Sequence, residues 1–153
     1  MNTRHRLSRT QLVMELTARR IETTGLHQGA ALNDEDWASY PPATYAPDAP
    51  CSVLHAFERA QRLAAGRTIR AGARRHGQVT VRPRAFHPAE FSEALRVLSD
   101  HLSDVAITPD LYRPLGLTET DYRLTVLSSW GESEGLTAVA AARTIRAAAP
   151  ARR

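Results

Sequence analysis

The side chains in this sequence that are best suited to chemistry are one cysteine and two histidines. Cys51 follows a proline at the predicted start of a helix, where the helix dipole favours a thiolate, and His55 comes one turn later on the same predicted face. His27 lies upstream, in a segment that also holds acids at positions 34–36. A nucleophilic thiol needs a histidine base, and a metal ion needs several such ligands. Cys51, His55 and His27 are therefore the candidate residues of a small hydrolase or metal-dependent enzyme.

Burial as a small apolar residue, the ordinary fate of a free cysteine, is the other interpretation of Cys51. The sequence has no phosphate-binding glycine loop, no dinucleotide fingerprint and no nucleophile elbow. The remaining histidines, at positions 5, 76, 87 and 101, share no ligand spacing. We therefore expect no cofactor and no metal, and we treat an enzyme as the second hypothesis.

Arginine dominates the charge of the chain. All 20 basic residues are arginine, a bias typical of high-GC coding sequences, which predicts an actinobacterial or actinophage source. Positions 59–84 hold eight arginines and no acid, whereas positions 90–134 hold nine acids against three arginines. The eight members of this Arg-rich segment are Arg59, Arg62, Arg67, Arg70, Arg74, Arg75, Arg82 and Arg84.

The Arg-rich segment predicts a contact face for nucleic acid or for an acidic protein partner, because guanidinium groups stay charged and bind phosphates and carboxylates in pairs. No aromatic residue lies between positions 59 and 84, although binders of single strands usually stack bases on aromatic rings. A solvated surface, or docking against the chain's own acidic half, is the alternative. The leading hypothesis is a non-enzymatic interaction or regulatory protein.

The elements that must carry these residues are mostly helices, since apolar residues recur at helical spacing. Ser8 and Gln11 form a capping box for a helix predicted over residues 9–24, which Gly25 ends. Residues 26–50 are predicted to form a long proline-interrupted loop.

A second helix is predicted downstream of this loop. Asp48 and Pro50 suit its cap and first turn, and Gly66 is expected to end it. A weaker helix follows over residues 68–76, and residues 79–81 alternate for the length of one short strand.

The most regular amphipathic run begins at Pro88. Its apolar stripe is compatible with burial inside the domain and equally with burial in a homodimer. The predicted stripe consists of Phe91, Ala94, Leu95, Leu98, Leu102 and Val105.

Three further helical signals follow. Thr108, Pro109 and Asp110 begin a short turn, and a capping pattern from Thr118 precedes a helix that Gly131 breaks. The last helix is predicted over residues 137–149. Its inward side chains are expected to be Val139, Ala142 and Ile145.

The predicted fold is thus mainly α, a compact single-domain bundle of about five or six helices with room for one short strand or hairpin. Residues 1–8 are expected to form a flexible arm, 9–149 the single helical domain and 150–153 a frayed tail. No stretch is apolar enough to span a membrane, and one cysteine cannot form an internal disulfide. We therefore expect a cytoplasmic protein without a membrane partner.

Three short motifs resemble one protein family. They are residues 21–29 (IETTGLHQG), with a helix end and a G-x-x-Q-G turn, residues 51–56 (CSVLHA), and residues 130–132 (WGE) followed by 135–137 (GLT). In this order they are similar to the domain of unknown function 6197, found in small actinobacterial and actinophage proteins. The chain departs from that pattern at Ser52 and His55, where the family has Ala and Gly, and at Gly131 and Glu132, where it has Asn and Asp.

The resemblance implies a compact helical domain of unassigned activity that is commonly linked with mobile elements such as phages and plasmids. It implies no reaction and no cofactor. The motifs are also explained by folding, because Gly25 and Gly29 permit positive φ, Cys51 and Leu54 suit a core, and Trp130 suits its edge.

Overall fold

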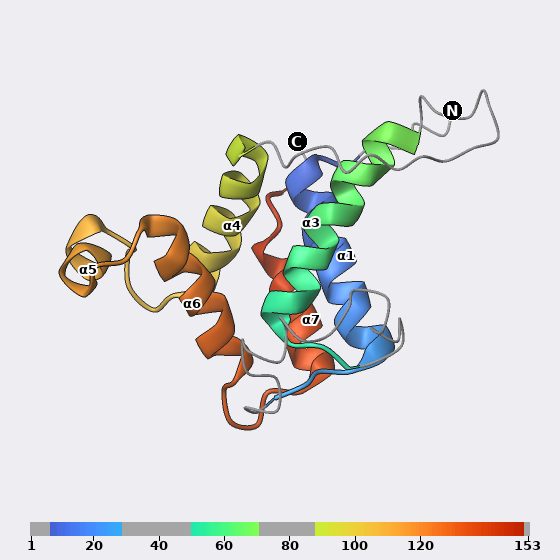
Figure 1. The fold of residues 1–153 in the computed structure, drawn as a ribbon. Coiled ribbons are helices and arrows are strands. Elements are labelled where there is room, and N and C mark those ends of the chain that lie inside the picture. The colour runs from blue at the N-terminus through green and yellow to red at the C-terminus, as the bar shows by residue number, and fades with distance from the viewer. Residues whose placement is uncertain (1–6, 29–49, 71–87, 152–153) are drawn as a thin grey trace, which may run out of the picture.

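Six α-helices and one 3-10 helix form the described part of the chain in this computed structural model (Figure 1). The structure describes residues 7–28, 50–70 and 88–151, apart from the side chains of 65–70 and 88–92. Among these residues, strand pairing is limited to one isolated parallel bridge between Leu26 and Cys51. The predicted mainly α fold is confirmed. In chain order the helices are α1 (Arg9–Thr24), α3 (Val53–Arg70), α4 (Pro88–Leu102), α5 (Pro109–Tyr112), η2 (Arg113–Leu115), α6 (Glu119–Gly131) and α7 (Ala138–Ala148).

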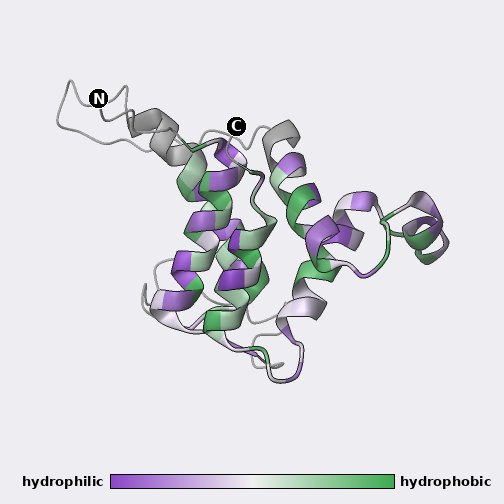
Figure 2. Cartoon of the chain, turned by 180° about the vertical axis from the view of Figure 1, so that it is seen from behind, coloured by the Kyte–Doolittle hydropathy of each residue, from purple (hydrophilic) through white to green (hydrophobic). Residues whose placement is uncertain are grey.

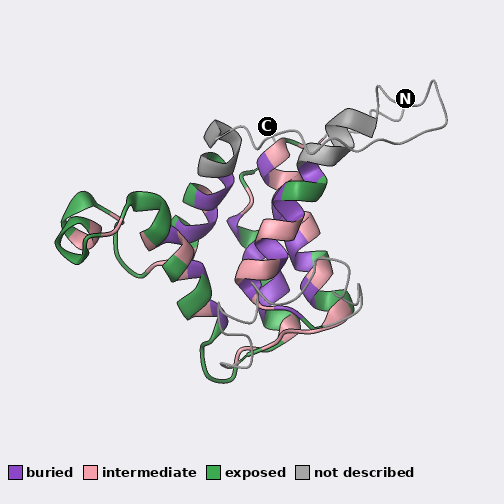
Figure 3. Cartoon of the chain, in the orientation of Figure 1, coloured by how far each residue is buried: buried purple, intermediate pink, exposed green. Residues whose placement is uncertain are grey.

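Helix α1 is the centre of the packing. It contacts α3, α7 and α4, while α6 packs against α4 and α3. Apolar and polar stretches alternate along the helices, and the buried segments face one another (Figures 2 and 3). The core is built from aliphatic and alanine side chains around Phe57, which is fully buried. Within the described residues, no helix combines the length and apolarity needed to cross a membrane.

Capping explains where several helices begin. The Ser8 hydroxyl accepts the Gln11 N–H at 3.2 Å, and the Gln11 side chain accepts the Ser8 N–H at 2.9 Å, which confirms the predicted capping box and the start of α1. Thr118 forms the same arrangement at α6 with Asp121, and Thr137 caps α7. Each cap satisfies backbone donors that the first helical turn leaves without an intrahelical partner.

The predicted bounds of the second helix are wrong at both ends. Helix α3 begins at Val53. The Ser52 hydroxyl accepts the His55 N–H at 3.1 Å, so Ser52 is the cap residue, whereas the sequence pattern predicts Asp48 and Pro50 for the cap and first turn. Gly66 lies inside α3 and does not end it. A glycine lowers the stability of a helix by only about 1 kcal/mol relative to alanine, which the rest of the helix can offset. The predicted strand at 79–81, and the part of the predicted weaker helix beyond Arg70, lie outside the described residues.

Two predicted core residues are exposed. Val105 is 57% exposed because α4 ends at Leu102, where the Ser103 hydroxyl donates to the Val105 carbonyl at 2.7 Å in place of another helical turn. Val139 is 63% exposed. At 100° per residue it points about 120° away from Ile145, which is buried as predicted together with Ala142.

Helix α5 and its flanking turns project from the body of the protein beyond α6 (Figures 1 and 3). No residue of α5 or η2 is buried. The rings of Tyr112 and Tyr122, with centroids 6.2 Å apart, connect this projection to α6. Gly116 ends η2 with φ +69°, a conformation that a residue with a Cβ adopts only with strain.

Candidate functional site

Cys51 lies where the chain returns to the end of α1. Its N–H donates to the Gly25 carbonyl at 3.3 Å, and its carbonyl accepts the His27 N–H at 3.0 Å. Its thiol is buried, with Sγ 3.8 Å from the Thr24 hydroxyl oxygen. These bonds give Cys51 a structural role, in which it joins the residues after α1 to the residues before α3.

The structure corrects the predicted relation between the cysteine and the histidines. Cys51 precedes the cap residue Ser52, so it does not share a helical face with His55. His27 meets Cys51 through backbone atoms. Within the described residues, no three His, Cys, Asp or Glu side chains gather as metal ligands would. Among the described residues, Cys51, His55 and His27 are therefore not part of a cluster that could hold a metal ion.

A cluster of positive charge lies along α3. Helical spacing of four and three residues places His55, Arg59 and Arg62 on one face, and Arg20 of α1 is close enough to act on the same histidine. Burial lowers the pKa of half-buried His55, and the charges of Arg20, Arg59 and Arg62 lower it further. We call these four residues the arginine face.

The arginine face has little acid to balance it. Glu58, the only acid in the sequence of α3, has a raised pKa because it is half-buried, although the charge of Arg62 opposes this shift. Among the described residues, neither Arg59 nor Arg62 makes an ion pair. Leu63 lies beside them on α3 with 47% of its surface exposed.

Several arginines elsewhere are neutralised. Arg123 is only 8% exposed and donates to Asp100 at 2.7 Å and to Glu119 at 2.9 Å. Burial opposes its charge, yet the hydrogen bonds that Arg123 donates to Asp100 and Glu119 raise its pKa above the ordinary value. The arginine face differs from this arrangement, because Arg59 and Arg62 make no ion pair with a described carboxylate, although the charge of Arg62 acts on nearby Glu58.

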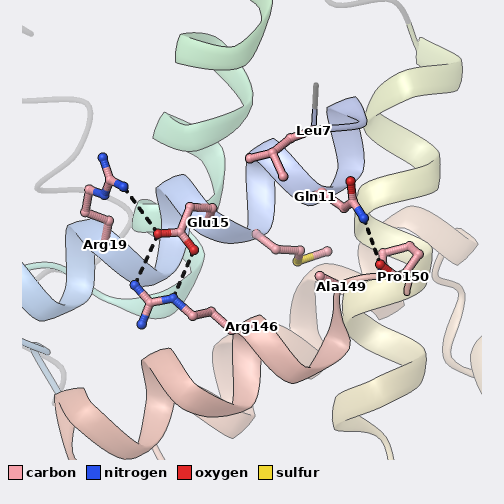
Figure 4. Close-up of a pocket in the computed structure, with 8 residues that line it drawn as sticks. Leu7, Gln11, Glu15, Arg19, Arg146, Ala149 and Pro150 are labelled. Carbon is pink, nitrogen blue, oxygen red and sulfur yellow. Dashed lines mark hydrogen bonds and ion pairs between the residues drawn. The ribbon is translucent and has the colours of Figure 1, made fainter. Parts of the chain in front are cut away.

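A groove of about 530 Å³ lies between the start of α1 and the end of α7 (Figure 4). Its polar end holds Arg146, which donates to Glu15 at 3.0 Å and to Glu22 at 2.8 Å. The hydrogen bonds from Arg146 lower the pKa of both carboxyl groups. At its other end the Gln11 amide donates to the Pro150 carbonyl at 2.9 Å. The ionic groups of this groove are thus already paired with one another.

Sequence patterns found only part of the arginine face. Arg59 and Arg62 belong to the predicted Arg-rich segment, whereas Arg20 was not singled out, because only tertiary packing brings α1 beside α3. Arg67 and Arg70 lie in α3, but their side chains are not described. The remaining predicted contacts, Arg74, Arg75, Arg82 and Arg84, lie outside the described residues.

The pH dependence of stability tests the environment of His55. Its pKa in the folded protein lies below the ordinary 6.5, so the unfolded chain takes up the proton first as pH falls. The stabilisation from neutral His55 is fully present above about pH 6.5 and is lost as pH falls through the lowered folded value. We expect wild type to lose more stability than His55→Gln between about pH 7.5 and pH 5.5, measured by urea unfolding.

The comparison of the two proteins controls for other titrating groups. Glu58 changes stability in the opposite direction, since its raised pKa favours the folded protein as pH falls, but it is present in both proteins. Equal losses in wild type and His55→Gln would contradict the assigned environment.

Comparison with known proteins identifies a family but does not assign an activity. A model described as a family of unknown function (DUF6197) matches residues 6–151. Neither a curated protein nor a solved structure matches the chain.

Proposed function

Since the chain belongs to the DUF6197 family, which has no assigned function, we propose an activity from its own surface: it is an interaction protein whose arginine face binds an acidic surface of a protein partner. The observation that carries the proposal is that Arg59 and Arg62 of α3 lie on one helical face with His55 and make no ion pair with a described residue.

Like charges one turn apart destabilise a helix by about 0.2–0.5 kcal/mol per pair, and Arg59 and Arg62 are such a pair. A bound carboxylate relieves that repulsion and offers guanidinium groups the paired geometry they bind best. The arginine face is therefore better satisfied in a complex than alone.

A protein partner is favoured over nucleic acid by the residues around the arginines. Leu63 adds an exposed apolar side chain beside Arg59 and Arg62, as is common at protein interfaces, where apolar residues are flanked by charges. No aromatic residue lies within the Arg-rich segment to stack on bases.

The proposal includes a setting for this interaction. We place the protein in the cytoplasm of an actinobacterium, as a regulatory or accessory protein of a phage or plasmid. The support is compositional: every basic residue is arginine, as high-GC coding favours, and the single cysteine suits a reducing compartment.

The test is fluorescence anisotropy with a labelled glutamate-rich peptide and, separately, a labelled DNA duplex. We expect Arg59→Glu with Arg62→Glu to weaken peptide binding at least about tenfold, equivalent to about 1.4 kcal/mol, because attraction becomes repulsion. The matched control is Arg113→Glu with Arg143→Glu, which makes the same charge change at two exposed arginines elsewhere and should leave binding unchanged.

Salt and the second probe decide between the outcomes. Binding should weaken with ionic strength, because the contacts are between charged groups that salt screens. Tighter binding of the duplex than of the peptide at physiological salt, lost in the same variant, would identify nucleic acid as the partner instead. Absence of peptide and duplex binding at low salt would reject the arginine face as a binding surface. Replacing Arg67, Arg70, Arg74 and Arg75 by Ala extends the test along the segment.

A further inference from the structure

The projection around α5 is an exposed apolar surface. We call residues 103–118 the α5 lobe. Leu115 is 64% exposed and Val105 57% exposed, and no residue of α5 or η2 is buried. Exposed large aliphatic side chains are candidates for contact with other macromolecules.

The α5 lobe carries acidic groups that no arginine neutralises. Asp104 and Asp110 are exposed and make no ion pair with any described residue. By contrast, the nearby Asp100 is paired with Arg123. Arg113 is the one basic residue in the sequence of the lobe, so the lobe has two acidic residues and one basic residue. The lobe therefore combines exposed apolar side chains with a net negative charge.

The arginine face has the complementary pattern. There, the exposed Leu63 lies near Arg59 and Arg62 on α3, and these two arginines also lack ion pairs among the described residues. One surface thus combines an exposed aliphatic side chain with two arginines, and the other combines exposed aliphatic side chains with two aspartates. Charge complementarity of this kind selects partners and orients their encounter.

The two surfaces lie on separate parts of one molecule. Figure 1 shows α5 on the far side of α6 from α3, and the described contacts of α5 are with η2 and α6. The described surfaces do not meet within one chain, but they can meet between two. We propose that the α5 lobe of one molecule docks on the arginine face of a second copy, an inference that rests on the proposed function and names one acidic partner for it.

Such a contact joins different surfaces of the two copies. A head-to-tail contact of this type continues into rings or short filaments, whereas a contact between identical surfaces stops at a dimer. Because the contact depends on exposed charges, salt should weaken it. We therefore expect association that grows with protein concentration at low ionic strength.

The experiment is sedimentation velocity over a concentration series at about 50 mM and about 500 mM salt, conditions that differ strongly in screening. The monomer mass is 16.9 kDa. We expect wild type to exceed this mass at low salt and to return to it at high salt. Arg59→Glu with Arg62→Glu, and separately Asp104→Arg with Asp110→Arg, should each remain monomeric, because both surfaces of each variant then carry charge of one sign.

Mixing the two variants is the decisive arm. The first retains an intact α5 lobe and the second an intact arginine face, so an equimolar mixture should regain the association that each has lost. Arg143→Glu, an exposed change on α7, is the matched control and should associate as wild type does. Leu115→Ser should weaken association several-fold while the helical circular dichroism stays unchanged.

Two outcomes would overturn the inference: a wild type that stays at 16.9 kDa at every concentration, or a mixture that stays monomeric. In either case, peptide binding that still depends on Arg59 and Arg62 would leave the proposed function standing with another acidic partner. Loss of peptide binding as well would reject both proposals.

Discussion

Replacing Phe57 by alanine is expected to lower the free energy of unfolding by about 3–5 kcal/mol, the range for deleting a buried aromatic side chain. Phe57 is fully buried on α3 and is among the largest side chains of the core. Its surroundings are mainly aliphatic and alanine side chains, which cannot extend to fill the space that a benzyl group leaves. Urea unfolding followed by circular dichroism measures the change.

Two variants of α3 control for this prediction. Phe57→Leu keeps most of the buried volume and should cost clearly less than the alanine. Leu63→Ala removes an exposed side chain from the same helix and should change stability by about 0.5 kcal/mol or less. Similar losses at Phe57 and Leu63 would mean that α3 does not bury the face described.

Replacing Arg123 by alanine is expected to cost about 2 kcal/mol. Its guanidinium joins α6 to α4 through Asp100 and the Ser99 hydroxyl, which lies 2.8 Å away, and it also pairs with Glu119 of its own helix. Removing one partner of a buried ion pair costs about 3–5 kcal/mol. The expected loss is smaller here because Asp100 and Glu119 are about half exposed and water can solvate them. The measurement is again urea unfolding.

The neighbouring Arg96 provides the comparison. It lies 3.9 Å from the same Asp100 but is largely exposed, so Arg96→Ala should cost about 0.5 kcal/mol or less. Arg123→Met, which keeps the aliphatic stem, should recover part of the loss. An Arg123→Ala protein as stable as Arg96→Ala would show that the buried pair makes no net contribution.

Local signals predicted the helices most successfully. The capping residues Ser8 and Thr118 mark their helices in sequence because the hydrogen bonds they make span only three residues. The bounds of α1, predicted from one such box and a following glycine, agree with the structure. The end of α3 was not predictable in this way, because Gly66 weakens a helix without breaking it.

The tertiary contacts of individual side chains could not be predicted from the sequence. Arg123 appears in the sequence as one more charged residue, yet it is buried because α4 supplies Asp100 opposite it. Val139 has an apolar side chain but lies on the wrong face of α7. In both cases burial depends on which neighbour the helix meets, and side-chain type alone does not encode that.

The candidate site was predicted only in part, for the same reason. The count of arginines in residues 59–84 pointed to α3, but it could not show that Arg20 joins them from α1. The apolar character of the α5 lobe was equally hidden, because Val105 belonged to a helical stripe in the sequence and to a turn in the structure.

The parallel bridge between Leu26 and Cys51 has a consequence for change in chain length. It holds the two ends of the intervening segment side by side, next to the contact between α1 and α3. Each doubling of a closed loop adds only about 0.6 kcal/mol of entropic cost. Related chains are therefore free to gain or lose residues at this point while keeping the same helical framework.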